Sequence, residues 1–194
     1  MPTIRALGIQ IVPLVLIFRG TGEQITAEEW AFYDSLENIT VVFQPKAWCD
    51  QDVMLWYLTD VLAPALIKHG LATEDQLILL DNLGSHKTPT VQRAMDALGL
   101  LPFYTAPGCT DVGAPVDHHV GNRLKKYMRD QYEADCEPGR NYDLWRNATY
   151  NAENEALCAK NRRKLMAKWA ADAWNDLILN NVQALFNAFL HTGG

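Results

Sequence analysis

Residues 76–87 read QLILLDNLGSHK, and this stretch decides the fold class. Its first five residues, QLILL, form a mostly apolar run of strand length, which suits a central strand that is covered on both faces. Asp81 comes directly after the run, and the turn signal Asn-Leu-Gly follows it. In open α/β sheets ligands bind at the carboxyl ends of the strands, so Asp81 is the first candidate for a site residue. The alternative is that its carboxylate only caps the turn, by accepting a hydrogen bond from the backbone near Gly84.

Strands and helices alternate on both sides of this stretch. Apolar positions at helical spacing between residues 50 and 68, such as Val53 and Tyr57, predict an amphipathic helix. Two strands joined by a short turn are expected within residues 3–18. The remaining expected elements are a strand at 41–43, a helix at 89–98, a strand at 100–105, a helix at 116–133 and a helical end from about 140 to 194. The alternation predicts one α/β domain over residues 1–194, with helices layered on a sheet.

Asp117 is the second candidate, because it lies in the first turn of the expected helix 116–133, after the loop TDVGAPVD. Capping is the alternative role, since a carboxylate at a helix start is stabilised by the helix dipole and the unpaired amides. One helix, one strand and one loop separate Asp81 from Asp117, and this layout can return both to the same end of the sheet. Two or three converging carboxylates can hold a pair of magnesium ions about 3.5–4 Å apart, which promote in-line displacement at a phosphate.

Charge is unevenly distributed along the chain. The net charge of −6 argues weakly against a nucleic-acid partner, because nucleic-acid-binding domains usually have a basic surface. However, residues 123–129 hold four cations without an anion, and residues 160–168 hold five. Each run is either a phosphate-binding surface or a solvated helix face, and the sequence leaves both readings open.

Composition excludes several classes of protein. With 48% hydrophobic and 21% charged residues, the chain has the make-up of a globular domain rather than a disordered one. No run of 18 or more apolar residues occurs, so no membrane-spanning segment is expected. The region around Ile9 to Phe18 lacks the features of a signal peptide, so we do not expect secretion. Four cysteines match no zinc spacing, which favours reduced thiols in an intracellular protein; they are Cys49, Cys109, Cys136 and Cys158.

Two segments together resemble a known family. LILLDNLGSH at 77–86 is similar to the second-Asp strand, and TDVGAPVDHHVGNRLKKYMR at 110–129 is similar to the third-Asp segment, of DDE superfamily endonuclease domains of the pogo and Tigger transposase type. In the second segment Thr110, Asp111, Pro115 and Asp117 match the family pattern. The likeness extends over nearly the whole chain, through LIFRGTG at 16–22 and RRKLMAKWAADAW at 162–174. It implies an RNase H-like mixed sheet flanked by helices, with a helical carboxy-terminal end.

The resemblance also implies roles for individual residues. Asp81 and Asp117 become ligands of Mg²⁺ (or Mn²⁺), and Asn82 and His86 lie beside the metal, although His86 also suits an ordinary loop position. Three basic residues become candidates for contacts with DNA phosphates: Lys125, Lys126 and Arg129. DNA is the implied partner and the nucleus the implied location, and a homo-oligomer is left open.

Departures from the family pattern bear on activity. The family uses three carboxylates, and the first lies on a strand ahead of the segment at 3–18, so we expect this first strand to be missing here. Ala114 stands where the family often has Gln, and His118-His119 follow the third Asp position. We therefore expect weak or no two-metal cleavage. Three readings remain: a fragment of a DDE endonuclease that cuts DNA with Mg²⁺ or Mn²⁺ once the missing strand is restored and is inactive without it, a domesticated module that binds DNA or protein without chemistry, and a transposon relic without function.

Overall fold

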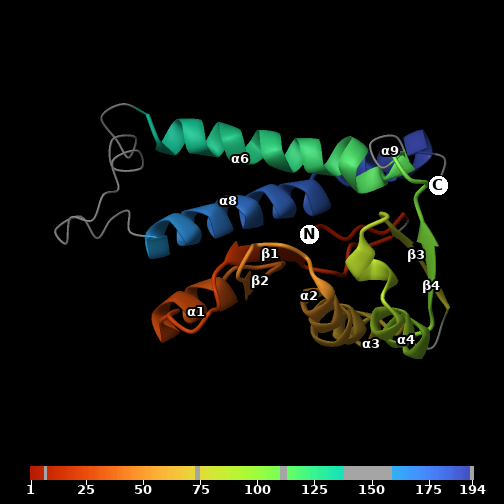
Figure 1. Cartoon of the computed structure of the whole chain (residues 1–194). Helices are drawn as coiled ribbons and strands as arrows, with labels where there is room; N and C mark the ends of the chain where they lie inside the picture. Colours follow the sequence, from red (N-terminus) through yellow and green to blue (C-terminus); the bar gives the residue numbers. More distant parts are fainter. Residues whose placement is uncertain (7, 73–74, 110–112, 138–158, 193–194) are drawn as a thin grey trace.

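The computed structural model describes residues 1–6, 8–72, 75–109, 113–137 and 159–192, and Figure 1 shows their arrangement. Strands and helices alternate in the first two-thirds of the chain, and helices follow. The strands are β1 (Leu14–Arg19), β2 (Ile39–Gln44), β3 (Gln76–Leu80) and β4 (Leu100–Tyr104). The α-helices are α1 (Ala27–Asp34), α2 (Gln51–Trp56), α3 (Ala63–Lys68), α4 (Pro89–Ala97), α6 (Gly121–Asp135), α8 (Ala159–Leu179) and α9 (Val182–Thr192). Three tighter or wider helical turns complete the set: η1 (Tyr57–Leu62), η2 (Gly84–Lys87) and η3 (Val116–Val120).

The four strands form two parallel pairs. β1 pairs with β2 in the register Leu14 to Ile39, and β3 pairs with β4 in the register Gln76 to Leu100. Each pair is joined by a crossover that contains a helix, α1 in the first and α4 in the second, as parallel strands require. The carboxyl ends of β3 and β4 therefore lie side by side, so the residue after each strand, Asp81 and Thr105, faces the same edge.

The expected hairpin within residues 3–18 is wrong. Among residues 1–13, with residue 7 outside the described part, the backbone forms no strand, and only β1 follows. The side chain of Gln10 replaces the missing strand pairing: its Oε1 accepts from Arg5 N at 2.7 Å, and its Nε2 donates to Arg5 O at 3.1 Å. An amide side chain can satisfy backbone groups as a neighbouring strand would, so the apolar alternation alone could not distinguish the two structures.

β1 lies between two hydrophobic cores, because its side chains alternate between faces. Leu14 packs into a cluster that we call the α8 core, and its neighbour Val15 packs into a second cluster, the α2–α4 core. Both side chains are almost fully buried, at 4% and 0% exposure. Figure 1 shows the corresponding layers, with α6 and α8 on one side of β1–β2 and α2, α3 and α4 on the other. The expected α/β layering is confirmed.

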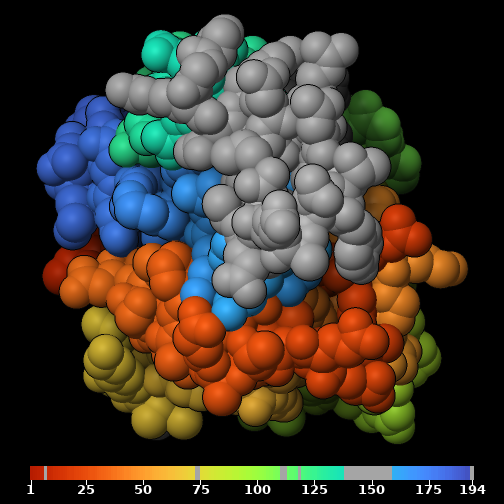
Figure 2. Space-filling model, turned by 90° about the vertical axis from the view of Figure 1, so that its left-hand side faces the viewer, coloured from red at the N-terminus to blue at the C-terminus, as the bar shows by residue number. Residues whose placement is uncertain are grey.

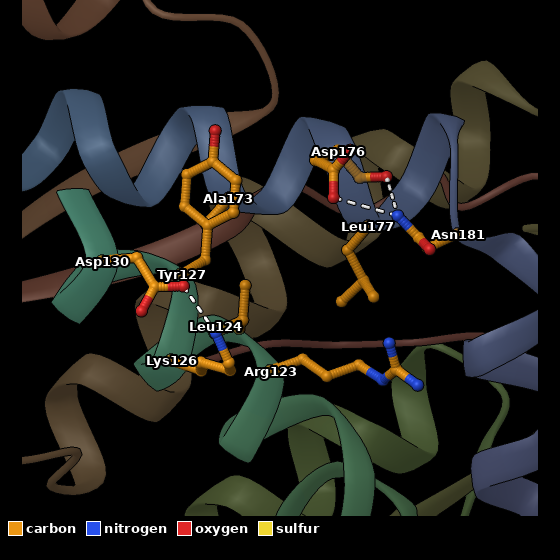
Figure 3. Close-up of a pocket in the computed structure, with 9 residues that line it drawn as sticks. All are labelled: Arg123, Leu124, Lys126, Tyr127, Asp130, Ala173, Asp176, Leu177 and Asn181. Atoms are coloured by element: carbon orange, nitrogen blue, oxygen red, sulfur yellow. Dashed lines mark hydrogen bonds and ion pairs between the residues drawn. The ribbon is translucent and has the colours of Figure 1, made fainter.

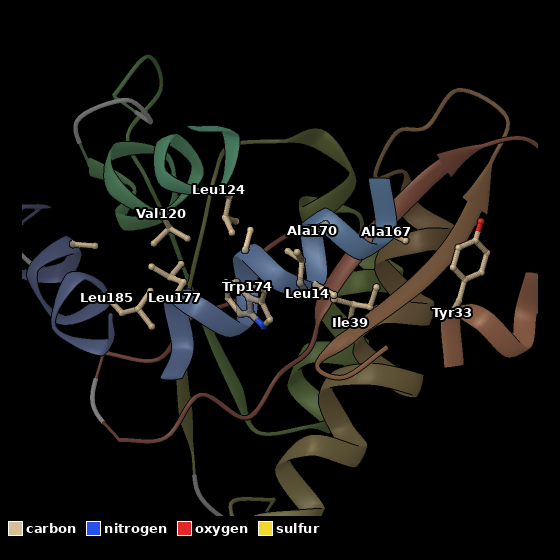
Figure 4. Close-up of a cluster of buried hydrophobic side chains, with 13 residues drawn as sticks. Leu14, Tyr33, Ile39, Val120, Leu124, Ala167, Ala170, Trp174, Leu177 and Leu185 are labelled. Atoms are coloured by element: carbon tan, nitrogen blue, oxygen red, sulfur yellow. The ribbon is translucent and has the colours of Figure 1, made fainter. Parts of the chain in front are cut away.

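The α8 core forms around Trp174, which is fully buried (Figure 4). Helix α8 contributes small residues such as Ala167 and Ala170 toward β1 and β2, which allows the helix to pack closely against the strands. Val120 and Leu124 bring η3 and α6 onto the same cluster. The helix that follows the second candidate carboxylate is thus fixed to the sheet by apolar burial, which is the main favourable term in folding.

Most of the expected helices are confirmed. The expected helix at 50–68 is one continuous helical segment, α2–η1–α3, with a π turn in its middle, and Asp50 caps it by accepting from Val53 N at 3.0 Å. The expected helix at 89–98 is α4, which begins after the capping Thr88 and ends before Gly99 at a φ of 66°. The helical end is confirmed in α8 and α9, whereas residues 140–158 lie outside the described part.

Candidate functional site

Asp81 lies at the carboxyl end of β3, as the sequence predicts. Its Oδ1 accepts a hydrogen bond from Leu83 N at 3.1 Å, and its side chain keeps 42% of its surface exposed. The turn-capping role is therefore real, but it uses one lone pair of one oxygen. The other lone pairs of an ionised carboxylate remain available for a ligand.

His86 lies against Asp81 from the turn η2. Its Nδ1 is 2.8 Å from Asp81 Oδ1, although the ring is not oriented for a linear N–H···O bond, and the residue is 7% exposed. Two further bonds fix this turn: Tyr104 Oη donates to His86 O at 3.0 Å, and Ser85 Oγ donates to Cys49 O at 2.9 Å. His86 thus lies beside the candidate carboxylate, and the loop after β2 reaches the same end of the sheet.

Asp117 lies in the π turn η3, which leads into α6 without a break. It is the acidic residue of the first turn, so the favourable interaction with the helix dipole stays open as an alternative role. Although the residue is exposed, partial burial of its carboxyl raises the pKa of Asp117, the charge of Asp81 raises this pKa further, and Lys125 lowers it. The first two candidates therefore lie close enough to repel each other, and Lys125 lies close to Asp117.

The π turn explains why Lys125 acts on Asp117. Residues eight positions apart in a regular α-helix point about 80° apart around the axis, since each residue turns the chain by about 100°. A π turn accommodates about one extra residue, which reduces the difference to roughly 20°. Asp117, Lys125 and Arg129 therefore follow one face of the η3–α6 helix. Lys126 lies on a neighbouring face, where its Nζ is 2.6 Å from Asp130 Oδ2.

Asn82 links the ends of the two strands. Its Nδ2 donates to the backbone oxygen of Thr105, and its Oδ1 accepts from Lys87 Nζ. The ammonium of Lys87 also lies 4.9 Å from the centre of the Tyr104 ring. Neither Lys87 nor Tyr104 was a candidate from the sequence. Lys87 follows Asp81 within one short turn and could have been noticed, but Tyr104 reaches it only because β4 pairs with β3.

The residues present suit a single divalent cation better than a pair. Two carboxylates that repel each other gain from a bound cation, and Mg²⁺ commonly takes one or two carboxylates, with waters and phosphate oxygens as its other ligands. Two-metal sites draw on more protein ligands. Within the described ranges, no group of three or more His, Cys, Asp or Glu side chains is placed to hold a metal ion.

A separate cleft lies between α6 and α8 (Figure 3), and neither Asp81 nor Asp117 lines it. Its volume is about 260 Å³, and Arg123 extends along it. The other charged groups are paired locally, Lys126 with Asp130 and Asp176 with Asn181. The cleft is therefore a seam between packed helices.

The chain is similar to a known family over most of its length. Residues 5–186 match the family described as DDE superfamily endonuclease. The chain belongs to this family. The match spans most of the 194 residues, so the DDE endonuclease domain has the predicted RNase H-like class and derives from a transposase. No curated protein and no solved structure matched the chain.

Other predictions about the DDE endonuclease domain are settled only in part. Thr110 and Asp111, which also match the family pattern, lie outside the described residues. No helix in the described ranges combines the length and the apolar character that crossing a lipid bilayer requires. The pogo and Tigger subtype stays a prediction.

Proposed function

We propose that this DDE endonuclease domain binds DNA together with one divalent cation, and that it does not cleave the DNA backbone by itself. The convergence of Asp81 and Asp117, seen in the effect of one charge on the pKa of the other, carries the proposal. Carboxylate oxygens are hard ligands that suit Mg²⁺ or Mn²⁺. When bound, the cation supplies positive charge that neutralises a DNA phosphate at the ends of β3 and β4.

Lys125 and Arg129 extend the phosphate-binding surface along α6. Both are exposed and follow the same helix face as Asp117, so a strand held at the carboxylates passes over them. Contacts of this kind position the nucleic acid and carry no sequence information. His86 and Asn82 are positioning residues in this proposal, because they fix the turn that presents Asp81.

Cleavage by this family rests on a third carboxylate, and the described residues offer two. With two carboxylates the site can hold a cation and a phosphate, but it lacks the ligands that would fix a second ion opposite the first. We therefore infer binding without chemistry. A domesticated DNA-binding module is the form of this function that the site supports best.

Cation binding is tested with Mn²⁺, followed by electron paramagnetic resonance on the 194-residue chain. We expect one bound ion, and a loss of affinity of at least tenfold, about 1.4 kcal/mol, in each of Asp81→Asn and Asp117→Asn. Asp96→Asn, an exposed carboxylate on α4, is the matched control and should bind like the wild type. Equal affinity in all four proteins would remove the metal site from the proposal.

Cleavage is tested by incubating supercoiled plasmid with the chain in Mg²⁺ or Mn²⁺. We expect DNA binding that weakens with salt, because bound phosphates release counterions, and no nicking above that of Asp81→Asn. Metal-dependent nicking that disappears in Asp81→Asn would contradict the inactivity. Absence of any salt-sensitive DNA binding would leave a protein partner as the better candidate.

We propose a nuclear location on the family resemblance alone, and fluorescence imaging of the tagged chain tests it. Self-association, which the family resemblance leaves open, is tested by light scattering with and without DNA.

A further inference from the structure

Lys87 is held at the strand ends by contacts from three directions. It closes the turn η2, its Nζ donates to Asn82 Oδ1, and its ammonium lies 4.9 Å from the centre of the Tyr104 ring. Asn82 follows Asp81 in the chain, so this ammonium and the first carboxylate share one turn. A lysine over an aromatic face is attracted by the electron-rich ring.

The support beneath Lys87 is fixed by bonds to β4 and to the loop after β2. Tyr104 Oη donates to His86 O at 3.0 Å, and Asn82 Nδ2 donates to Thr105 O. Ser85 Oγ donates to Cys49 O at 2.9 Å. The backbone that carries Lys87 is therefore anchored on both sides, and the position of the ammonium depends on tertiary contacts.

The charge of Lys87 is not neutralised by its neighbours. Its two partners, an amide oxygen and an aromatic ring, are both uncharged, and it forms no ion pair within the described ranges. The lysines of α8 behave differently: Lys160 and Lys164 contact Glu28, and Lys168 contacts Asp172. A positioned ammonium without a carboxylate partner is suited to an anion, and phosphate is the anion that this family handles.

We propose that Lys87 binds a phosphate oxygen of the DNA strand that lies across Asp81 and Asp117. This inference rests on the proposed function, and it names a contact that neither the sequence nor the family match assigns. Lys87 then contacts the DNA backbone from the β4 side, whereas Lys125 and Arg129 contact it from α6. The strand is enclosed by cations from two separate elements, with the two carboxylates between them.

Loss of the Lys87 charge should change DNA binding and cation binding in opposite directions. An ammonium on the turn that follows Asp81 repels a divalent cation held by Asp81 when no phosphate is present, since like charges disfavour each other. The same ammonium attracts the phosphate. Lys87→Ala should therefore weaken DNA binding while Mn²⁺ binding to the protein alone stays equal or becomes tighter. Unfolding or a loosened turn would weaken both.

The test uses the 194-residue chain, a fluorescein-labelled DNA duplex followed by polarisation, and Mn²⁺ followed by electron paramagnetic resonance. Lys87→Ala should lower DNA affinity at least fivefold and reduce the slope of log K against log salt by about one. Lys87→Arg should restore most of the affinity. Lys68→Ala is the matched control, because Lys68 is exposed on α3 ahead of the amino end of β3, at the opposite end from Asp81.

The outcomes separate this inference from the proposed function. If the wild type binds no DNA, the proposed function fails. If the wild type binds DNA, but Lys87→Ala matches Lys68→Ala in affinity and salt slope, only the role of Lys87 is overturned. Parallel loss of DNA and Mn²⁺ binding in Lys87→Ala would also overturn it, by making Lys87 a structural support of the turn.

Discussion

Glu29 is the most deeply buried carboxylate of the described residues, with 1% exposure. Arg163 donates to both of its oxygens, at 2.8 and 3.0 Å, and Tyr33 Oη donates at 2.6 Å. Burial raises the pKa of the Glu29 carboxyl, but the bonds from Arg163 and Tyr33 and the charge of Arg163 outweigh burial, so the pKa is lowered. This cluster joins α1 to α8, and Figure 2 shows the two helices in direct contact.

The lowered pKa predicts how stability depends on pH. Glu29 contributes stability fully above its ordinary pKa of 4.5, and the contribution is lost as the pH falls through the lower folded value. We expect Glu29→Gln to reduce the free energy of unfolding by about 2 kcal/mol at pH 7, below the usual cost of breaking a buried pair because Arg163 is partly exposed. Urea denaturation at pH 7 and pH 3 checks this, and the difference from wild type should shrink at pH 3.

Glu28→Gln is the control for this prediction. Hydrogen bonds from Lys160 and Lys164 lower the pKa of Glu28 to about 2, but the carboxylate is exposed, and exposed ion pairs contribute little to stability. The loss should be clearly smaller than in Glu29→Gln. An equal loss in both variants would show that burial of Glu29 does not matter.

At the scale of elements, the η3–α6 helix separates basic residues by face. Lys125 and Arg129 follow the face of Asp117, whereas Lys126 is paired with Asp130 at 2.6 Å on the face of the α6–α8 cleft. Lys125→Ala and Arg129→Ala should each lower DNA affinity about three- to tenfold and reduce the salt slope by about one. Lys126→Ala should change affinity less than twofold in the same polarisation assay. Equal losses of DNA affinity in all three variants would mean that DNA responds to the overall positive charge of α6 and does not follow one face of the helix.

The elements also show what the sequence could predict. The strand at QLILL and the helix at 89–98 were predictable from the local pattern and the stop signals, but the expected cover on both faces of the strand is wrong, because β3 pairs only with β4 within the described residues and Leu77 is 74% exposed. The segment at 3–18 was not predictable, since its pairing is made by the side chain of Gln10. The basic run at 160–168 was ambiguous for another reason. Its partners Glu28 and Glu29 lie more than a hundred residues earlier in the chain. The positions of Asp81 after a strand and of Asp117 at a helix start were predictable, whereas their role as metal ligands stays a prediction.

At the scale of the whole molecule, the net charge of −6 is an average that conceals the local charge near Asp81 and Asp117. Much of the positive charge on α8 is neutralised by α1, whereas Lys125 and Arg129 of α6 and Lys87 form no ion pair within the described ranges. Both sets lie near the two carboxylates. A chain with an acidic average can therefore present a local basic surface, and its DNA binding should be weak and strongly dependent on salt.

The two cores should unfold together, because β1 belongs to both. Leu14 packs into the α8 core and Val15 into the α2–α4 core, so neither core can open while the strand keeps its place in the other. Leu14→Ala and Met95→Ala each remove a buried side chain from one core only and should each cost about 3 kcal/mol. In both variants, urea transitions followed by circular dichroism and by tryptophan fluorescence should coincide, as two-state unfolding requires. If the cores were independent, Met95→Ala would split the transition, since the α2–α4 core, against which Trp56 packs, would unfold before the α8 core around Trp174. A coincident shift would establish residues 1–194 as one cooperative unit.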